Sequence, residues 1–475
     1  MIAAATAAGS ALAALALRAT RPRYLLVACL AAVMLLQNLA TMLTLRSGVV
    51  PIGQGELLLV SKEVFAIVAL ALSALIRLAG AVRTGTVRLS RTERLAILFF
   101  AVVAIGFARS GSVPLAASLA GARSLVILPA LYLLGLWLGA DARDARRTMH
   151  LLVAAGAVLA VFGLLEAYVL PEGFWLAIGH EEYYLMKRGR PVQGQLFENM
   201  RYWVGSTSVR RIASLTGDPL ISSYLLAFPL WLLTTFAIVR RRARPALVAF
   251  CGVMLTALTL TFSRGAFATL VFAAVTLLAG RRAANAVALT LGAFVATIVV
   301  TLAFEDVLLR VTTGAGHIEQ LRQGLNLVLR APLGLGTGTA GAAAAAIALA
   351  SGGGGTAVAA DSFIGSLLTQ VGVPGLALFL ATMLSMVHDL YRLAAFRSGP
   401  LPGWWYLATA TFLAGLLVVS TVNESGYGFV AVGLVFVWAG MLVGVERAAA
   451  LAPSPTAQHP LAYEPSPATG AVPAR

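Results

Sequence analysis

Apolar runs long enough to cross a bilayer recur from one end of the chain to the other, and they limit its fold more than any other feature. Inside hydrocarbon a backbone must satisfy its own hydrogen bonds, so only α-helices and closed barrels span membranes. The runs are continuous rather than alternating, which argues against a β-barrel. Only 11% of the 475 residues are charged, against about 25% in a soluble domain. This composition excludes a soluble enzyme and a disordered chain.

At about 20 residues per span, the runs predict an all-α polytopic membrane protein with about 12–13 transmembrane helices and two long outer-face loops. We expect residues 1–450 to form a single integral membrane domain, whose outer loops cover about 171–219 and 304–361. The tail, 451–475, is rich in proline and lacks apolar periodicity, so we expect a disordered cytoplasmic segment. The expected spans are Ile2–Leu17, Tyr24–Leu45, Leu57–Ile76, Leu95–Ala108, Ser124–Gly139, Leu151–Leu170, Leu220–Val239, Leu247–Phe262, Ala266–Ala279, Ala284–Ala303, Ser362–Val387, Trp404–Val422 and Phe429–Val445.

Basic residues predict the orientation of the chain. The net charge is +16, and arginines gather in alternate loops, at 18–23, 77–94, 143–147, 240–244, 281–282, 392–397 and 447. Such loops face the cytoplasm, so topology explains the charge and no nucleic acid is expected as a partner. The N-terminus lacks the charged region of a cleaved signal peptide, so its first apolar stretch is expected to stay as a helix. Cys29 and Cys251 lie inside apolar runs and are interpreted as small core residues.

The two outer loops differ from ordinary membrane connections. The first combines aromatic and charged residues from Trp175 to Arg211. The second predicts an amphipathic surface helix from His317 to Arg330, where Pro332 stops it. A Gly/Ala-rich stretch follows from Gly334 to Ala360, and we expect it to be flexible. The polar stripe of the helix consists of Glu319, Arg322, Asn326 and Arg330, and the apolar stripe of Leu321, Leu325 and Val328.

Outer arginines beside apolar spans are the main candidate binding residues. Arg264 lies between two spans with almost no loop, where it either snorkels to the interface or clamps a phosphate. Arginine suits a clamp because its planar fork binds phosphate bidentately and keeps its proton. Arg210 and Arg211 precede a helix start signalled by Asp218-Pro219, and they are either a solvated loop pair or anion ligands.

Three further basic residues are weaker candidates for contact with a substrate. Arg123 is placed at the outer end of the fifth expected span, where lipid headgroups alone explain an arginine. Lys62 lies next to Glu63 in an apolar stretch, so simple pairing with a neighbour is the competing interpretation. Arg322 belongs to the polar stripe of the expected surface helix, where it can face a substrate.

Candidate proton acceptors lie in the same outer segments. His317 falls on the apolar side of its expected helix, so packing competes with catalysis. Asp361 begins a span, where a plain helix N-cap is the alternative. Glu424 lies in an outer turn between the last two spans. Any of the three can accept a proton if its pKa suits that role. No His/Cys cluster predicts a metal site, and no nucleotide-binding motif follows a strand.

Several of these motifs occur together in a known order. The chain carries the outer arginine pair, then Thr261-Phe262-Ser263-Arg264-Gly265, and later a Pro-x-Gly-x-Gly-x-Gly element from Pro332 to Gly338. A Ser-x5-Leu-x3-Gly-x2-Gly element ends at Gly375. This order and spacing, over roughly 210–385, resembles the O-antigen ligase/polymerase superfamily. The N-terminal half is similar only in topology and hydropathy.

The resemblance implies a glycosyltransferase whose site faces the periplasm or cell exterior. Its donor would be an undecaprenyl-diphosphate-linked glycan, used without nucleotide sugar, metal or cofactor. The family's arginine roles fall on Arg211, with Arg210 as an alternative, and on Arg264. Paired guanidiniums would stabilise the charge that develops on a diphosphate leaving group. The attacking group would be a hydroxyl of a glycan acceptor.

One departure from the family's pattern favours one branch of it. Ligases typically carry His-Asn where this chain has Asp361-Ser362. We therefore expect a polymerase of O-antigen, capsule or exopolysaccharide repeat units in a bacterial inner (plasma) membrane, with a chain-length regulator and a flippase as further partners. The alternatives are an O-antigen ligase or protein oligosaccharyltransferase, a secondary transporter or flippase, and a structural scaffold. No internal repeat is evident, which disfavours a transporter.

Overall fold

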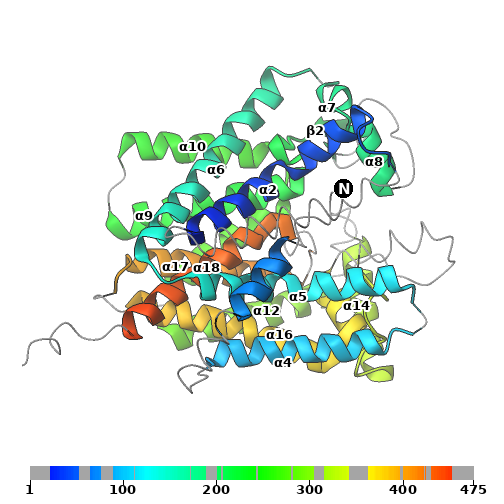
Figure 1. Cartoon of the computed structure of the whole chain (residues 1–475), viewed down its shortest axis with the longest axis vertical. Coiled ribbons are helices and arrows are strands. Elements are labelled where there is room, and N and C mark those ends of the chain that lie inside the picture. Colours follow the sequence, from blue (N-terminus) through cyan, green and yellow to red (C-terminus); the bar gives the residue numbers. More distant parts are fainter. Residues whose placement is uncertain are drawn as a thin grey trace, which may run out of the picture.

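The computed structural model shows a predominantly helical polytopic membrane protein (Figure 1). Seven of its described helices are long and apolar enough to cross a membrane, and four shorter apolar helices accompany them. The structure describes residues 22–52, 65–75, 77, 89–111, 113–171, 173–188, 200–204, 207–241, 244–279, 282–303, 315–341, 362–395, 399–421, 423 and 429–451.

The elements follow the predicted order of spans. The first expected span and the tail, 451–475, lie outside the described residues except for Leu451, which ends the last helix. The helices are α2 (Pro22–Arg46), Phe65–Leu75, α4 (Arg91–Ala108), α5 (Leu115–Leu138), α6 (Ala142–Tyr168), α7 (Phe174–Ala177), α8 (His180–Arg188), α9 (Pro219–Arg240), α10 (Pro245–Leu260), α11 (Arg264–Ala279), α12 (Ala283–Ala303), α14 (Ala315–Arg330), α16 (Phe363–Ala395), α17 (Gly403–Val419) and α18 (Phe429–Leu451).

Two helices begin earlier than their apolar runs predict. Helix α6 starts at Ala142 because the Asp141 carboxylate caps it, accepting a hydrogen bond from Arg143 N at 2.8 Å. Its first turns are charged, so hydropathy alone misses them. Helix α5 starts at Leu115 and includes a run of small residues. The placement of Arg123 at a helix end is therefore wrong, since it lies in the third turn of α5.

The predicted start of α9 is confirmed. Asp218 has an extended backbone, and its carboxylate accepts hydrogen bonds from Leu220 N at 2.9 Å and Ile221 N at 3.3 Å. Pro219 occupies the first helical position, where its missing N–H costs nothing. Residues next to one another in the sequence therefore determine where α9 begins.

Helices α5 and α18 pack closely against each other in the bundle. A Cβ on Gly135 would lie 1.9 Å from Val437 O, and one on Gly440 would lie 2.0 Å from Tyr132 O. Gly139 and Gly444 make similar backbone approaches, so each helix presents a Gly-x3-Gly pair. Small residues let helix backbones approach closely where hydrocarbon supplies no hydrophobic drive.

The outer loops contain structure that the sequence analysis did not predict. A β-hairpin of β1 (Arg201–Val204) and β2 (Thr207–Arg210) lies in the first loop, together with α7 and α8. The one-turn helix η3 (Ser214–Thr216) then leads to α9. The predicted amphipathic helix of the second loop is confirmed as α14: Leu321 is buried, whereas Arg322 and Arg330 are exposed.

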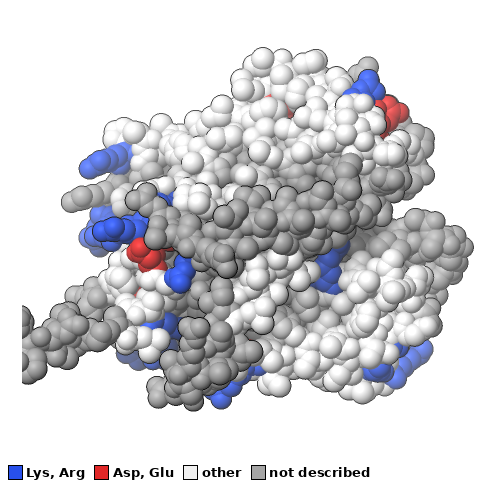
Figure 2. Space-filling model, in the orientation of Figure 1, with Lys and Arg blue, Asp and Glu red and all other residues white. Residues whose placement is uncertain are grey.

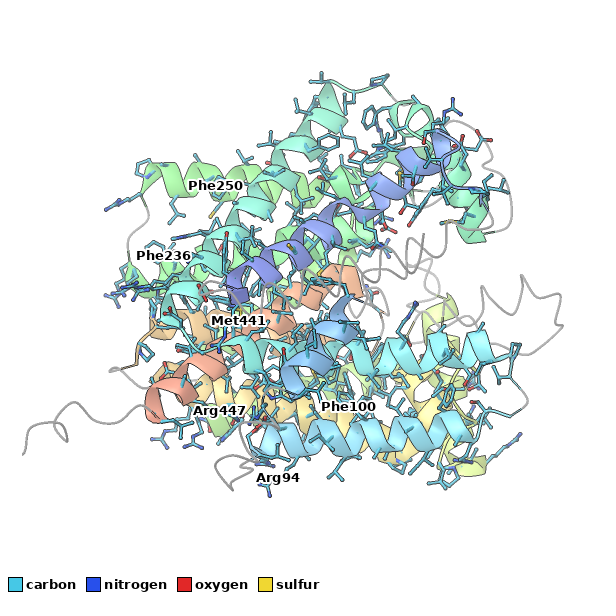
Figure 3. All side chains as sticks on the ribbon, viewed as in Figure 1. Arg94, Phe100, Phe236, Phe250, Met441 and Arg447 are labelled. Atoms are coloured by element: carbon cyan, nitrogen blue, oxygen red, sulfur yellow. The ribbon has the colours of Figure 1, made fainter. Side chains whose placement is uncertain are left out.

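Basic side chains gather at the opposite end of the bundle, which the arginine pattern predicts to be cytoplasmic (Figure 2). Arg94 and Arg447 lie at this end (Figure 3). Glu93, whose side chain is fully buried, pairs with Arg77 and Arg447, both at 2.8 Å, and accepts a hydrogen bond from Trp137 Nε1 at 3.1 Å. A buried carboxylate needs such partners, and here they join α4, α5 and α18.

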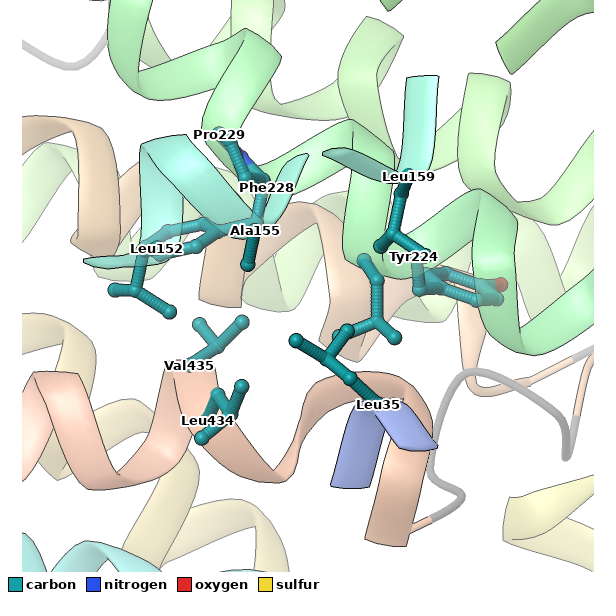
Figure 4. A pocket seen from close by; sticks show the side chains of 10 residues that line it. Leu35, Leu152, Ala155, Leu159, Tyr224, Phe228, Pro229, Leu434 and Val435 are labelled. Carbon is teal, nitrogen blue, oxygen red and sulfur yellow. The ribbon is translucent and has the colours of Figure 1, made fainter. Parts of the chain in front are cut away.

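A small apolar recess lies between α2, α6, α9 and α18 (Figure 4). The Tyr224 ring borders this recess, while its hydroxyl points away from it (Figure 4). The recess is lined by Leu35, Leu152, Ala155, Leu159, Tyr224, Leu225, Phe228, Pro229, Leu434 and Val435.

The glycine contact between α5 and α18 yields a first prediction. Gly135→Ala and Gly440→Ala should each lower the free energy of unfolding by about 1–3 kcal/mol, because the new methyl group meets backbone that must move. The measurement is thermal or denaturant unfolding in detergent.

Matched controls lie on helices whose glycines have open space. No atom lies within 4 Å of a Cβ placed on Gly252 or Gly292. Alanine there should raise stability by about 0.5–1 kcal/mol, because it favours the helix. Equal effects at all four positions would contradict the close contact between α5 and α18.

Candidate functional site

A tight turn between α10 and α11 forms the centre of the candidate site. Helix α10 ends at Leu260, and α11 begins at Arg264, so only three residues connect the two helices. Phe262 adopts a left-handed backbone (φ 50°), which is uncommon for a bulky residue. Ser263 O accepts a hydrogen bond from Phe267 N at 3.3 Å and so continues the first turn of α11. The Arg264 side chain is exposed at this helix start.

Arg211 reaches the same turn from the hairpin. Its backbone N donates to Met200 O at 2.8 Å, and the next residue, Ile212, donates to Leu260 O at 3.1 Å. The Arg211 side chain is buried, and its Nε donates to Thr261 O at 2.7 Å. The carbonyl end of a helix favours a positive charge, which offsets part of the cost of burying a guanidinium. The structure thus brings Arg211 and Arg264 to the two sides of one turn.

Gly265 lies against two polar side chains, one from α9 and one from the segment after α17. A Cβ at this position would lie 2.1 Å from Asn423 Nδ2 and 2.5 Å from the Tyr224 hydroxyl. Asn423 Nδ2 donates to the Tyr224 hydroxyl at 3.2 Å. The Ser-Arg-Gly element therefore needs its glycine for space, and the contact holds Asn423 beside the start of α11. Glu424, the next residue, lies outside the described residues.

The start of α16 joins the same region through the end of α17. Ser362 Oγ accepts a hydrogen bond from Gly365 N at 3.1 Å, which is the hydrogen bond of an N-cap. The same Oγ donates to Thr421 O at 2.7 Å, two residues before Asn423. Ser362 therefore performs the capping role considered for Asp361. Asp361 itself lies outside the described residues.

The Pro-Gly element and the Leu-x3-Gly element form one unit around a break in α16. Gly372 has a non-helical backbone (φ 65°, ψ −161°), and Pro374 has no N–H to offer Gln370 O. The glycine loop, residues 334–341, provides donors to the carbonyls that the break frees. Leu335 N donates to Thr369 O at 2.8 Å, and Gly336 N donates to Gln370 O at 3.1 Å. In return, Val373 N donates to Pro332 O at 2.9 Å.

Residues 334–341 are therefore packed, and the expectation of a flexible stretch is wrong for this part of it. Gly334, Gly336 and Gly338 all have positive φ. A Cβ on Gly338 would lie 2.6 Å from backbone of Ala117. Gln370 Oε1 accepts a hydrogen bond from Gly338 N at 2.8 Å. Backbone packing against α4, α5 and α16 orders this glycine-rich segment, whereas 342–360 lie outside the described residues.

The remaining candidates lie apart from this turn or outside the described residues. Arg210 points toward α6, where its Nη1 donates to Leu170 O at 3.2 Å. Arg123 is half-buried in α5, and Arg322 is exposed on α14. His317 belongs to the first turn of α14, but its side chain is outside the described residues. Lys62 is outside them altogether.

Two residues that support the site were missed in the sequence. Glu166 ends an apolar span and is fully buried beside the arginine pair. Gln370 is buried within α16 and bridges Ser366 Oγ and Gly338 N. An ionisable or amide side chain inside an apolar run is a signal that marks such positions. Among the described residues, no three His, Cys, Asp or Glu side chains are placed to hold a metal ion.

Comparison with models of known protein families finds no match for this chain, and no curated protein matches it.

The docking of the glycine loop yields a second prediction. Gly372→Ala would place a Cβ 2.2 Å from Pro332 O and force a methyl-bearing residue into a left-handed conformation. We expect the free energy of unfolding to fall by about 1–3 kcal/mol and hydrogen exchange at Leu335 and Gly336 to become faster. The measurement is hydrogen–deuterium exchange in detergent. Gly111→Ala is the control, because a Cβ there meets nothing within 4 Å. Unchanged exchange in Gly372→Ala would contradict the docking.

Proposed function

We propose that the chain is a glycan polymerase that joins polyprenyl-diphosphate-linked repeat units of O-antigen, capsule or exopolysaccharide at the outer face of the bacterial inner (plasma) membrane. The observation that carries the proposal is the 2.7 Å hydrogen bond from Arg211 Nε to Thr261 O. It places Arg211 at the end of α10, three residues before Arg264, although the two arginines are 53 positions apart in sequence. Two guanidiniums beside a helix N-terminus suit the charge of a diphosphate.

The proposed reaction transfers a glycan from its lipid diphosphate to a sugar hydroxyl. The acceptor oxygen forms a bond to the anomeric carbon of the donor, while the bond from that carbon to the diphosphate oxygen breaks. The diphosphate leaves with both bonding electrons, and Arg211 and Arg264 stabilise its charge. A base takes the proton of the acceptor hydroxyl. His317, Asp361 and Glu424 are the candidates for this base.

A transporter or flippase is a second candidate, because α16 is a broken helix and such helices form substrate sites in many transporters. In those sites, unwound backbone groups coordinate the cargo. Here the glycine loop accepts that role, since Leu335 N and Gly336 N bond the carbonyls exposed by the break. The break in α16 therefore fits a rigid structural role better than it fits an ion or substrate site.

The experiment that tests the proposal is reconstitution of the purified protein with lipid-diphosphate-linked repeat units. A ladder of lengthening lipid-linked glycans supports the polymerase. Transfer of the glycan to a lipid A core or a protein acceptor instead supports a ligase or protein oligosaccharyltransferase. An intact donor with every acceptor contradicts both transferases and favours the transport hypothesis.

The arginine pair yields a third prediction. Arg211→Lys and Arg264→Lys should each lower polymer formation by about 10- to 100-fold, because lysine keeps the charge but lacks the two-pronged donor. The measurement is the initial rate of donor consumption per mole of folded protein. Arg330→Lys is the control, since Arg330 is exposed at the end of α14, away from the turn. Full activity in both test variants would contradict the diphosphate clamp.

A further inference from the structure

Glu166 is a carboxylate enclosed in the last turn of α6, with no exposed surface. Its oxygens accept hydrogen bonds from Trp175 Nε1 at 2.8 Å, Ala213 N at 3.0 Å and Ser214 N at 2.7 Å. A buried carboxylate is retained only where donors replace its lost hydration. Two of these donors are consecutive backbone N–H groups, separated from the arginine pair by one residue, Ile212.

The two arginines of the pair face different partners. Arg210 Nη1 donates to Leu170 O, and its charge lies close enough to act on the Glu166 carboxylate. Its Nε and Nη2 are enclosed without a hydrogen-bond partner among the described residues. Arg211 points to the turn before α11 instead. Successive side chains of an extended segment point to opposite sides, which explains the division.

Glu166 also holds a strained backbone. Ser214 has φ 50°, a left-handed conformation that costs a non-glycine residue of the order of 1–3 kcal/mol. Such a conformation persists only when its surroundings determine it. Here Glu166 accepts from Ser214 N, and Ser214 Oγ donates to Leu159 O at 2.7 Å. Both anchors belong to α6, so α6 determines the path of the chain after Arg211.

We propose that Glu166 is a positioning residue for donor binding, and that it acts through the backbone of 213–214 to present Arg211 beside Arg264. Arg210 balances the charge of Glu166 and serves the scaffold, so Arg211 is the member of the pair that meets the diphosphate. This inference rests on the proposed function. The family resemblance gives the role to Arg211 and leaves Arg210 as an alternative, whereas the contacts of the buried carboxylate distinguish the two.

The test compares two isosteric substitutions in the full-length protein in lipid nanodiscs. Glu166→Gln keeps the size of the side chain but replaces one acceptor oxygen with an NH2 group that faces N–H donors. Glu93→Gln is the matched control, because Glu93 is equally buried, accepts from a Trp Nε1 and pairs with arginines at the other end of the bundle. The readouts are undecaprenyl diphosphate binding, hydrogen exchange at 211–216 and the thermal midpoint.

We expect Glu166→Gln to weaken undecaprenyl diphosphate binding on the order of 10- to 100-fold, because a small displacement of Arg211 separates it from its partner arginine. Exchange at Ala213 and Ser214 should accelerate in the same variant. Glu93→Gln should lower the thermal midpoint as much as Glu166→Gln does. Its binding of undecaprenyl diphosphate and its exchange at 211–216 should be unchanged. Equal loss of binding in both variants, or unchanged binding in Glu166→Gln, would overturn the positioning role.

Failure of the proposed function gives a different result. If the wild-type protein binds undecaprenyl diphosphate no better than a lipid monophosphate, the donor site is wrong, whatever Glu166 does. If the wild type binds it and Arg211→Lys weakens the binding while Glu166→Gln leaves it unchanged, the donor site stands and the positioning role fails.

Discussion

Hydrocarbon offers no hydrogen-bond partner to a charged side chain or an open backbone group, so each one in this protein must find a partner within the fold. The end of the molecule that carries the candidate site meets this requirement in three ways. Arg211 donates to a carbonyl at the end of α10, Glu166 accepts from backbone N–H groups, and the break in α16 is closed by the glycine loop. Each solution joins segments that are distant in sequence, and together they build the candidate site.

Glycines determine how closely those segments approach. Gly265 lets Asn423 and Tyr224 lie over the start of α11, and Gly372 lets the chain of α16 turn against the backbone of the loop. In the bundle, Gly135 and Gly440 let α5 and α18 pack backbone to backbone. A rigid contact of this kind supports a site better than a mobile one, because a two-pronged guanidinium clamp depends on sub-ångström placement.

Much of the helical frame follows from local signals, which is why the sequence predicts it. Apolar runs identify the spans, and Asp218-Pro219 marks the start of α9. Polar and apolar residues that recur at a spacing of three or four positions predict α14. The first turns of α6 are helical although they are charged, so the start predicted from hydropathy is wrong. Hydropathy indicates which residues lie in the membrane and does not indicate backbone conformation. The packed part of the glycine-rich loop is missed because its partners, in α4, α5 and α16, lie elsewhere in the chain.

The sequence by itself determined the membrane-spanning helical class and the arginines that are worth examining, because both depend on residue chemistry and on spacing within one segment. Only the tertiary structure decided that Arg211 shares a turn with Arg264, that Glu166 holds the backbone of Ser214, and that Ser362 caps α16. These relations depend on which carbonyl or N–H group lies within about 3 Å of a given side chain. Packing between distant segments determines that distance, and no local pattern of residues encodes it.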